Sequence, residues 1–334
     1  MEPPAPRDSA DPGAYPWRDD PLMVAPMVAC IGAAHVDRKA VAAGPVVPGS
    51  SNPVSMRVGM GGVARNVAEN LARLGLSVTL VSRVGADREG DAVLASLTDA
   101  GIGVDGCSCS TTAPTASYTA LMDRGGELVV GLADMAIYDE LTVEHIEPLL
   151  PRLERIPVWF IDCNLPAESL RLLLRRKPRD CTVYVDCVSV ANAARLQGIL
   201  GGIDTLFANG DEASYLSHIP IRAPLDVCEA GYRLMCGGVG SVVITRGREG
   251  AFVASPFDYD FFLPPPVDVN EVTGAGDALI AGVIFGRLGG HAMDDAMRLG
   301  LACAAWAVEA AETVNPILSA DIVIERAGLL RKTA

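Results

Sequence analysis

The 334-residue chain lacks an excess of positive charge. It contains 27 Lys and Arg residues against 41 Asp and Glu residues, which gives a formal net charge of −14. Proteins that bind a nucleic-acid backbone present a basic surface, so this composition argues against a nucleic-acid partner. It does not exclude a nucleotide, because a small anion needs only a local positive site.

The chain also lacks long apolar segments and paired cysteine motifs. Gly, Arg or Asp interrupts the longest apolar stretches within a few residues, so the sequence predicts no membrane span. The nine cysteines form no CxxC pair, and their odd number fits reduced cytosolic thiols better than a disulfide framework. Cys107 and Cys109 are a poor metal site, because no nearby His completes a ligand set. We expect a cytoplasmic protein without a membrane partner.

The first 22 residues differ in composition from the rest of the chain. They are rich in Pro and Asp and contain no apolar signal core, so we expect residues 1–22 to form a disordered tail. The remaining residues, 23–330, are numerous enough to bury a large core, and no internal repeat divides them. They are expected to form one globular domain.

Short runs rich in Val and Ile alternate with helical patterns along this domain. Such alternation is typical of an α/β fold in which helices cover both faces of a parallel sheet. In residues 61–75, Val63, Val67 and Leu71 form an apolar stripe, and Gly75 ends the predicted helix. The predicted strands are residues 27–33, 77–85, 158–163, 182–187, 205–209 and 241–247.

Two segments in the N-terminal half break this alternation. Residues 116–134 are predicted to form two strands joined by a turn at residues 123–126. Residues 37–59 are polar, rich in Gly and Pro, and have little helical character. Together the two segments suggest a small β lid beside the main sheet, and the alternative is a pair of surface loops.

The sequence NEVTGAGDALIAG, residues 270–282, places an acid beside two glycines at the start of an apolar helix. Gly274 and Gly276 allow backbone N–H groups to approach a bulky anion, as they do in loops that bind phosphate. An ordinary reading of Asp277 is a partner for the helix dipole. An acid beside an anion site also suits a base that works next to a phosphate.

The sequence GMGGVARN contains a loose match to the dinucleotide fingerprint. A dehydrogenase is disfavoured, because about 25 irregular residues separate this loop from Gly32 and no acid follows at the spacing that ribose recognition requires. The alternative is that Gly61 and Gly62 let a polyol approach the backbone. The Asn66 amide would then bind its hydroxyl groups.

Polar side chains follow several predicted strands. Asp37 follows the first strand and would suit a ribose diol, although it could also be a loop acid in solvent. Asn209 and Glu212 follow another strand and could orient magnesium-bound water. Thr245 and Gly247 end the next strand, where they could meet a phosphate. The carboxyl ends of parallel strands share one edge, so we expect these residues to cluster there.

The sequences GGVARNVAENLARLG and EVTGAGDALIAG resemble the two signature motifs of the ribokinase-like (PfkB) carbohydrate kinases. The resemblance covers about residues 25–330, and the two motifs occur in the expected order. The sequences ELVVGLADMAIYDELT, FIDCNLPAESL and VDCVSVANAARL resemble the pseudouridine kinase branch more than ribokinases or adenosine kinases. The resemblance implies a Rossmann-like domain with a β lid that often mediates homodimerisation. It also implies ATP with Mg²⁺ as cofactors and often K⁺ as an activator.

The resemblance also implies roles for individual residues. Asp277 corresponds to the catalytic base, and the N–H groups of Gly274, Ala275 and Gly276 correspond to the anion hole. The implied ribose ligands are Asp37, Gly61, Gly62 and Asn66, and the implied positions around ATP and its metal are Asn209, Glu212, Thr245, Gly247, Thr273 and Asn315.

The chain departs from this family pattern at several positions. His35 replaces the usual Asn of this branch, and Glu271 stands where relatives place Asp or Asn beside the monovalent cation. The longer side chain of Glu271 puts that cation site in doubt. The candidates for the residue that recognises the nucleobase are His35, Asn52, Ser117 and Asp134.

The resemblance implies transfer of phosphate from ATP to the 5′-hydroxyl of pseudouridine. Two alternatives stay open: a kinase of the same fold that acts on ribose or another nucleoside, and a non-catalytic nucleoside sensor. The complete Gly274–Asp277 loop speaks against a sensor, which has no need of both a base and an anion hole.

Overall fold

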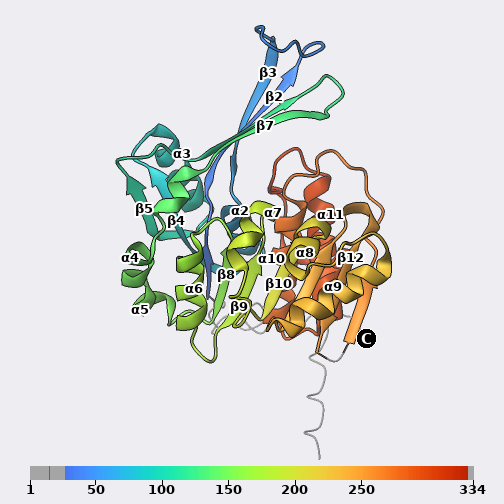
Figure 1. Ribbon diagram of the computed structural model, residues 1–334. Coiled ribbons are helices and arrows are strands. Elements are labelled where there is room, and N and C mark those ends of the chain that lie inside the picture. The colour runs from blue at the N-terminus through green and yellow to red at the C-terminus, as the bar shows by residue number, and fades with distance from the viewer. Residues whose placement is uncertain (1–14, 16–26, 257, 330–334) are drawn as a thin grey trace, which may run out of the picture.

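The computed structural model describes Tyr15 and residues 27–256 and 258–329 (Figure 1). The predicted tail, residues 1–22, lies outside the described residues except for Tyr15. The Tyr15 ring is buried and stacks on Phe285 with ring centroids 4.3 Å apart. This one residue of the tail segment therefore packs on the domain.

A nine-stranded sheet forms the centre of the domain, in the order β13-β12-β11-β10-β9-β8-β1-β4-β5. The strands from β11 to β5 pair in parallel, and β12 and β13 add an antiparallel edge. All six predicted strands are present, and β5, β12 and β13 are additional. Their bounds are β1 (Met27–Ile31), β4 (Ser77–Gly85), β5 (Gly103–Ser110), β8 (Val158–Asp162), β9 (Thr182–Asp186), β10 (Thr205–Asn209), β11 (Ser241–Thr245), β12 (Ala251–Ser255) and β13 (Asp258–Phe262).

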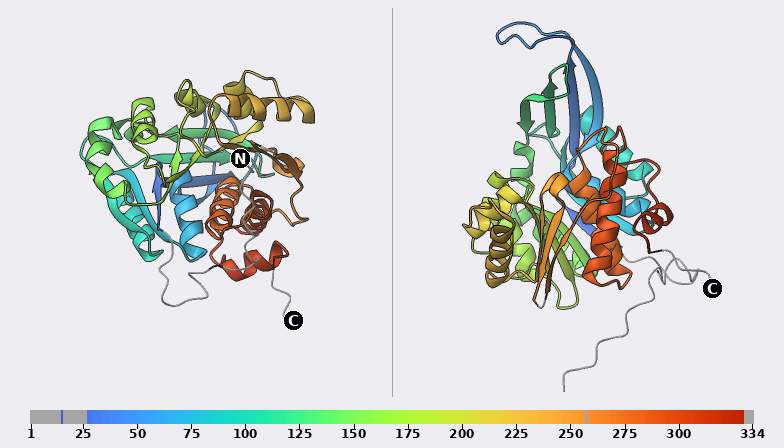
Figure 2. Two further views of the ribbon diagram at one scale, coloured as in Figure 1. Left: turned by 90° about the horizontal axis from the view of Figure 1, so that it is seen from below. Right: turned by 90° about the vertical axis from the view of Figure 1, so that its right-hand side faces the viewer.

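Helices cover both faces of this sheet, as the alternating pattern predicts. The first layer contains α2 (Val63–Arg73), α3 (Arg88–Asp99), α10 (Ala275–Leu288), α11 (Met293–Val308) and α12 (Ala320–Arg326). The second layer contains η1 (Ala136–Glu140), α4 (Val143–Ile146), η2 (Glu147–Leu149), α5 (Leu150–Leu153), α6 (Ala167–Arg176), α7 (Val190–Ala193), η3 (Ala194–Leu196), α8 (Gly210–Ser217) and α9 (Pro224–Cys236). The right view of Figure 2 shows α8 and α9 on one side of the sheet and α10 and α11 on the other. Among the described residues, no helix is both long and apolar enough to cross a membrane.

A separate four-stranded sheet, which we call the lid, projects from the main body (Figure 1). Its order is β3-β2-β6-β7, so it combines the two segments that break the alternation and confirms the small sheet over the surface-loop alternative. The bounds are β2 (His35–Ala42), β3 (Val54–Gly61), β6 (Ser117–Met122) and β7 (Leu128–Asp134).

The two faces of the lid differ in what they present. Neighbouring residues in register share a face, so Asp37 lies beside Gly59 and Tyr118. The opposite face carries Arg38 and Ala40 and their partners in register. It presents exposed apolar side chains: Val54, Met56, Val58, Val130 and Leu132.

The carboxyl ends of the central parallel strands bring polar residues together. Asp162 at the end of β8 pairs in register with Asp186 at the end of β9. Asn209 at the end of β10 pairs with Thr245 at the end of β11. Ligands of open α/β sheets bind outside these strand ends, so this edge is the expected place for a site.

Candidate active site

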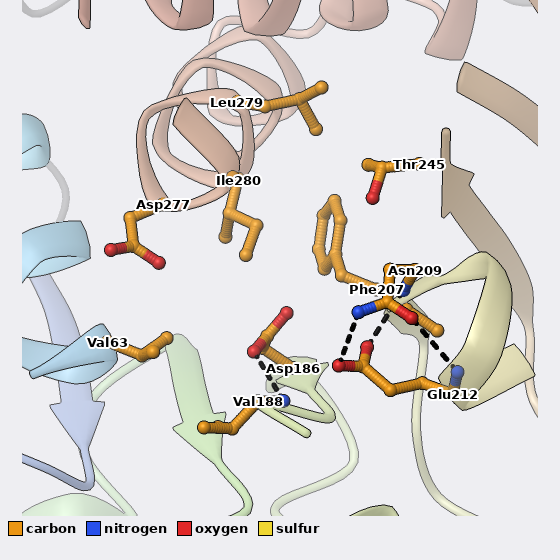
Figure 3. A pocket seen from close by; sticks show the side chains of 12 residues that line it. Val63, Asp186, Val188, Phe207, Asn209, Glu212, Thr245, Asp277, Leu279 and Ile280 are labelled. Carbon is orange, nitrogen blue, oxygen red and sulfur yellow. Dashed lines mark hydrogen bonds between the residues drawn. The ribbon is translucent and has the colours of Figure 1, made fainter. Parts of the chain in front are cut away.

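A cavity of about 180 Å³, which we call the inner pocket, opens at this edge of the sheet. Figure 3 shows the acid side chains of Asp277, Asp186 and Glu212 around it, with Thr245 on the far wall. The lining residues are Val63, Asp186, Val188, Phe207, Ala208, Asn209, Glu212, Thr245, Gly276, Asp277, Leu279 and Ile280. The structure therefore brings together predicted residues from three separate segments: Asn209 and Glu212, Thr245, and Gly276 with Asp277.

Asp277 lies in the first turn of α10, directly after the glycine-rich turn. Gly274 caps the helix in a left-handed conformation with φ of 83°. A Cβ atom there would lie 2.2 Å from the carbonyl oxygen of Thr313, so glycine is required on two counts. The first N–H groups of a helix have no partners within it. Gly276 and Asp277 of this first turn line the inner pocket, whereas Gly274 and Ala275 do not, and the N–H group of Ala275 donates to the carbonyl oxygen of Val272 at 3.3 Å.

The pKa of Asp277 is raised to about 7. Burial of the carboxyl group is the main cause, because it penalises the charged form. A hydrogen bond from Nδ2 of Asn66 to Oδ2 of Asp277, 2.8 Å long, opposes this shift. The charges of Asp162 and Asp37 raise the pKa further. A carboxyl group with this pKa suits proton transfer near neutral pH.

The double glycine before α2 is required by close contacts. A Cβ atom on Gly61 would lie 2.3 Å from a carboxylate oxygen of Asp37. A Cβ atom on Gly62, which has φ of 103°, would lie 2.4 Å from the carbonyl oxygen of Ala33. The two glycines thus let the Asp37 carboxylate and the turn after β1 pack directly on the chain that leads into α2.

His35 contacts the predicted ribose ligand Asp37. The Tyr138 hydroxyl donates to the carbonyl oxygen of Ala34 at 2.9 Å, so Nδ1 of His35 is the donor in its 3.2 Å contact with that hydroxyl. Nε2 of His35 lies 3.1 Å from Oδ1 of Asp37, and the two groups form an ion pair when the imidazole carries both protons. His35 thus lies between Asp37 and Tyr138, a residue that the sequence did not single out.

Asp162 is a fully buried acid that the sequence analysis left unassigned. Oδ2 accepts hydrogen bonds from the N–H groups of Ala33 and Ala64 at 2.8 and 3.0 Å. Oδ1 accepts from the backbone and side chain of Asn164 at 2.9 and 3.0 Å. Burial raises the pKa of Asp162, and these hydrogen bonds oppose that shift. Asp162 thus fixes the turn after β1 and the start of α2, on which Asn66 lies.

Asp186 is a second acid missed by the sequence analysis, although it ends a predicted strand. Burial, followed by the nearby charges of Glu212 and Asp277, raises its pKa well above the ordinary value. Asp186 accepts a 2.8 Å hydrogen bond from the N–H group of Val188, which has a positive φ of 65°. A β-branched residue rarely adopts this conformation, and such strain concentrates at functional sites.

Asn209 and Glu212 form a reciprocal cap at the start of α8. Oδ1 of Asn209 accepts from the N–H groups of Asp211 and Glu212 at 2.9 and 3.0 Å. Glu212 accepts from the backbone and the side chain of Asn209 at 2.8 and 2.7 Å. This cap holds both side chains in the wall of the inner pocket, where burial raises the pKa of Glu212.

A larger cavity of about 860 Å³, which we call the lid cavity, lies beneath the lid. Asp37 and Tyr118 line it from the lid, and Arg65 and Arg73 line it from α2. The lining residues also include Arg38, Lys39, Arg57, Val58, Gly59, Met60, Glu69, Ala120, Met122, Leu128, Glu271, Val272, Thr273, Ala311, Glu312, Thr313, Val314 and Pro316. Five basic and four acidic residues therefore line this one cavity.

Other predicted site residues lie apart from both cavities. The Asn52 side chain is exposed and hydrogen-bonds Val47 and Ser50. Ser117 and Asp134 pair in register on the lid face opposite Asp37. The geometry thus favours Tyr118 over these residues as a contact for a ligand beneath the lid.

Two predicted nucleotide contacts, Gly247 and Asn315, also lie outside the lining of both cavities, and a third, Thr273, lines the lid cavity. Gly247 begins η4 (Gly247–Glu249), two residues after Thr245. Asn315 is buried and binds backbone at both ends of its amide, donating to Trp306 and accepting from Ile317 at 2.6 and 3.1 Å. Asn315 therefore organises its own loop.

Comparison with known proteins gives a consistent result. The pattern of the pfkB family carbohydrate kinases matches residues 25–320. Pseudouridine kinase of Escherichia coli is 32% identical, over 89% of this chain and 95% of that protein. Guanosine-inosine kinase of Exiguobacterium acetylicum is 25% identical, over 85% of this chain and 95% of that protein.

Solved structures show the same fold. A carbohydrate kinase from Agrobacterium tumefaciens has a TM-score of 0.79 and 31% identity, and the match covers 91% of this chain and 98% of that one. Arabidopsis thaliana ribokinase complexed with ribose and ATP also has a TM-score of 0.79, at 18% identity over 91% and 99% of the two chains. With its two signature segments joined at Asn66 and Asp277, this chain belongs to the pfkB family of carbohydrate kinases.

Proposed function

We propose that this protein transfers the γ-phosphoryl group of ATP to the 5′-hydroxyl of pseudouridine. The observation that carries the proposal is the position of Asp277. Its carboxyl group lines the inner pocket, accepts a hydrogen bond from Asn66, and is close enough to Asp37 for that charge to raise its pKa. An acid at this junction can meet a hydroxyl on one side and a phosphate on the other.

In the proposed step, Asp277 accepts the proton of the 5′-hydroxyl as its oxygen bonds to phosphorus. The N–H groups of Gly274, Ala275 and Gly276 stabilise the charge on the transferred group, since they begin α10 beside the pocket. Asn66 orients the base through its 2.8 Å hydrogen bond. Asp37 accepts hydrogen bonds from the ribose diol, and the turn at Gly61 and Gly62 lets the ribose approach the backbone.

We propose that the magnesium ion that accompanies ATP binds in the inner pocket. Mg²⁺ is usually held by one or two carboxylates together with phosphate oxygens and water. Asp186 and Glu212 supply two carboxylates on one wall, each with its pKa raised by burial and nearby acids, so a cation would relieve their repulsion. When bound, the ion would neutralise phosphate charge. Thr245 lies in the same wall and is a proposed nucleotide contact.

Pseudouridine as the substrate is supported by the full-length similarity to the E. coli pseudouridine kinase. Pseudouridine exposes one more ring N–H group than uridine does. An acceptor aimed at that group would be left unpaired by uridine, at a cost of about 1–3 kcal/mol. The Tyr118 hydroxyl is a candidate acceptor, because Tyr118 lies on the same lid face as Asp37, lines the lid cavity, and extends its hydroxyl over Gly131 of the neighbouring strand β7.

A substrate panel tests the proposal. ADP release is measured with pseudouridine, uridine, inosine, adenosine and ribose, and product identity is checked by mass spectrometry. We expect kcat/KM for pseudouridine to exceed that for uridine by about tenfold or more. Equal values for the two nucleosides would leave a nucleoside kinase and remove the pseudouridine assignment. Nucleoside binding without any ADP release would indicate a sensor.

A further inference from the structure

The carboxylate of Glu271 is occupied by groups of the protein itself. Oε2 of Glu271 accepts a hydrogen bond from the ammonium group of Lys39, which reaches across from lid strand β2. Oε1 accepts from the N–H and the hydroxyl of Thr273 at 3.2 and 2.7 Å. The carboxylate that the family resemblance assigns to a monovalent cation thus already holds a positive charge.

The backbone around Glu271 is satisfied in the same way. The carbonyl oxygen of Val308 accepts from the N–H groups of Asn270 and Glu271 at 2.8 and 3.1 Å. The carbonyl oxygen of Pro316 accepts a 2.7 Å hydrogen bond from the guanidinium of Arg73. Arg73 and Lys39 line the same cavity as Glu271, and each is paired with an acid, Arg73 with Glu69 and Lys39 with Glu271. A free K⁺ ion would have to displace the Lys39 ammonium from Glu271 and the Arg73 guanidinium from Pro316 to reach these oxygen ligands.

The residues present therefore do not fit a free monovalent cation, and the structure supplies a replacement. We propose that the Lys39 ammonium acts as a tethered cation that fixes the anion-hole turn. This role rests on the proposed kinase function. Lys39 holds Glu271, Glu271 holds Thr273, and Thr273 directly precedes Gly274, the cap of α10. Lys39 and Glu271 are positioning residues in this scheme.

The tether also links the lid to the catalytic turn. Lys39 lies two residues from Asp37 on the same face of β2, so both side chains point into the lid cavity. Its neighbour Arg38 points to the other face and pairs with Glu89 in α3. The lid therefore has two ionic anchors, and only the Lys39 anchor leads to the turn before Asp277.

This difference between the two anchors provides a matched control. Lys39→Met and Arg38→Met each remove one cation and one lid anchor. ADP formation is compared in KCl, NH₄Cl and tetramethylammonium chloride at equal ionic strength. We expect the wild type and Arg38→Met to be indifferent to the cation. Lys39→Met should be slow in tetramethylammonium and recover in K⁺ or NH₄⁺ by about fivefold or more, the lower end of typical coupling between sites.

A second readout does not depend on catalysis. Thermal unfolding of the same proteins is followed in the same three salts. We expect K⁺ to raise the Tm of Lys39→Met but not that of the wild type, Arg38→Met or Glu271→Gln, which lacks the carboxylate. If no nucleoside is phosphorylated, the kinase proposal fails while this comparison still tests the tethered cation.

Two results would overturn the proposal. The first is activation or stabilisation of the wild type by K⁺ relative to tetramethylammonium, since that would show a working site for a free ion. The second is a Lys39→Met variant that responds to cations no more than Arg38→Met does. A Lys39→Met variant whose Tm is lower than that of the wild type, and is not raised by any of the cations, would also overturn the proposal.

Discussion

Nδ2 of Asn66 lies 2.8 Å from Oδ2 of Asp277, and this hydrogen bond joins α2 to α10. The two residues are 211 positions apart in the chain. The bond stabilises the ionised form of a carboxyl group whose burial favours the protonated form. Asn66 therefore lowers the pKa of the proposed base as well as orienting it.

Replacement of the proposed base should abolish turnover. Asp277→Asn keeps the size of the side chain but removes the proton acceptor, and loss of a general base typically costs about 10²- to 10⁴-fold in rate. We expect kcat to fall in this range, while ATP and nucleoside affinities measured by calorimetry stay within a few fold. Asp99→Asn, at the exposed end of α3, is the matched control. A near-normal kcat for Asp277→Asn would assign the base elsewhere.

The raised pKa of Asp277 predicts the pH dependence of the reaction. Only the ionised carboxylate accepts a proton, so kcat/KM should rise with pH and level off above about 7. Asn66→Ala removes a hydrogen bond that lowers this pKa, so it should shift the rising limb to higher pH. A pH profile that is flat between pH 5 and 8 would contradict the assignment.

The raised pKa of Asp277 also predicts that the stability of the fold falls with rising pH, whereas the activity rises. The folded state holds the Asp277 proton up to a pH of about 7, whereas the unfolded chain releases it near its ordinary value of 3.8. The folded state therefore binds more protons between these values, and the contribution of Asp277 to stability is lost as the pH rises through this window. Urea unfolding of the wild type and Asp277→Asn between pH 4 and 8 measures this difference.

The central sheet and the turn before α10 could be predicted from the sequence because their signals are local. Runs of Val and Ile mark β8 and β10, and the two glycines before Asp277 mark the turn that begins α10. The edge strand β5, with the sequence GVDGCSCS, lacks this signal because small and polar residues dominate it. It forms through its pairing with β4, which a local pattern does not reveal.

The supporting acids were missed for a related reason. Asp162 and Asp186 end predicted strands, but their roles depend on partners distant in sequence, such as Ala64 and Asp277. The faces of the lid were also inaccessible to sequence reasoning. Ser117 and Asp134 lie in the segment predicted to form the lid, which made them candidates for binding the nucleobase. The register of β2, β6 and β7 places them on the face opposite Asp37.

Asp162 is expected to matter for stability more than for chemistry. All four of its hydrogen-bond partners are donors, so Asp162→Asn would turn an amide N–H group toward N–H groups of Ala33 and Ala64 or of Asn164. Hydrogen bonds to charged groups contribute about 1.5–3 kcal/mol each, so we expect the free energy of unfolding to fall by roughly 2–5 kcal/mol. Urea denaturation measures this free energy of unfolding. Asp180→Asn, at an exposed position, should change the free energy of unfolding by less than about 0.5 kcal/mol.

Asp37 is expected to act on nucleoside binding. Asp37→Ala removes an acceptor for the ribose diol, and charge-assisted hydrogen bonds of about 1.5–3 kcal/mol correspond to about a tenfold or larger rise in nucleoside Kd. ATP affinity should be unchanged, as calorimetry can show. Asp134→Ala, on the other lid face, is the control. Equal nucleoside affinities for the two variants would place Asp37 outside the substrate site.

The apolar outer face of the lid leads to the last prediction, homodimer formation. Met56, Val58 and Leu132 are 48%, 64% and 60% exposed, although they share one face of one sheet. An exposed apolar surface of this kind marks an interaction site, and the family resemblance implies that a second copy covers it. We expect a dimer in sedimentation experiments, which Leu132→Asp should weaken by about tenfold or more, because it buries an unpaired charge. Leu225→Asp makes the same change at an 80% exposed position on α9 and should leave the dimer intact. A wild type that stays monomeric at high concentration, or equal effects of the two substitutions, would contradict assembly through the lid.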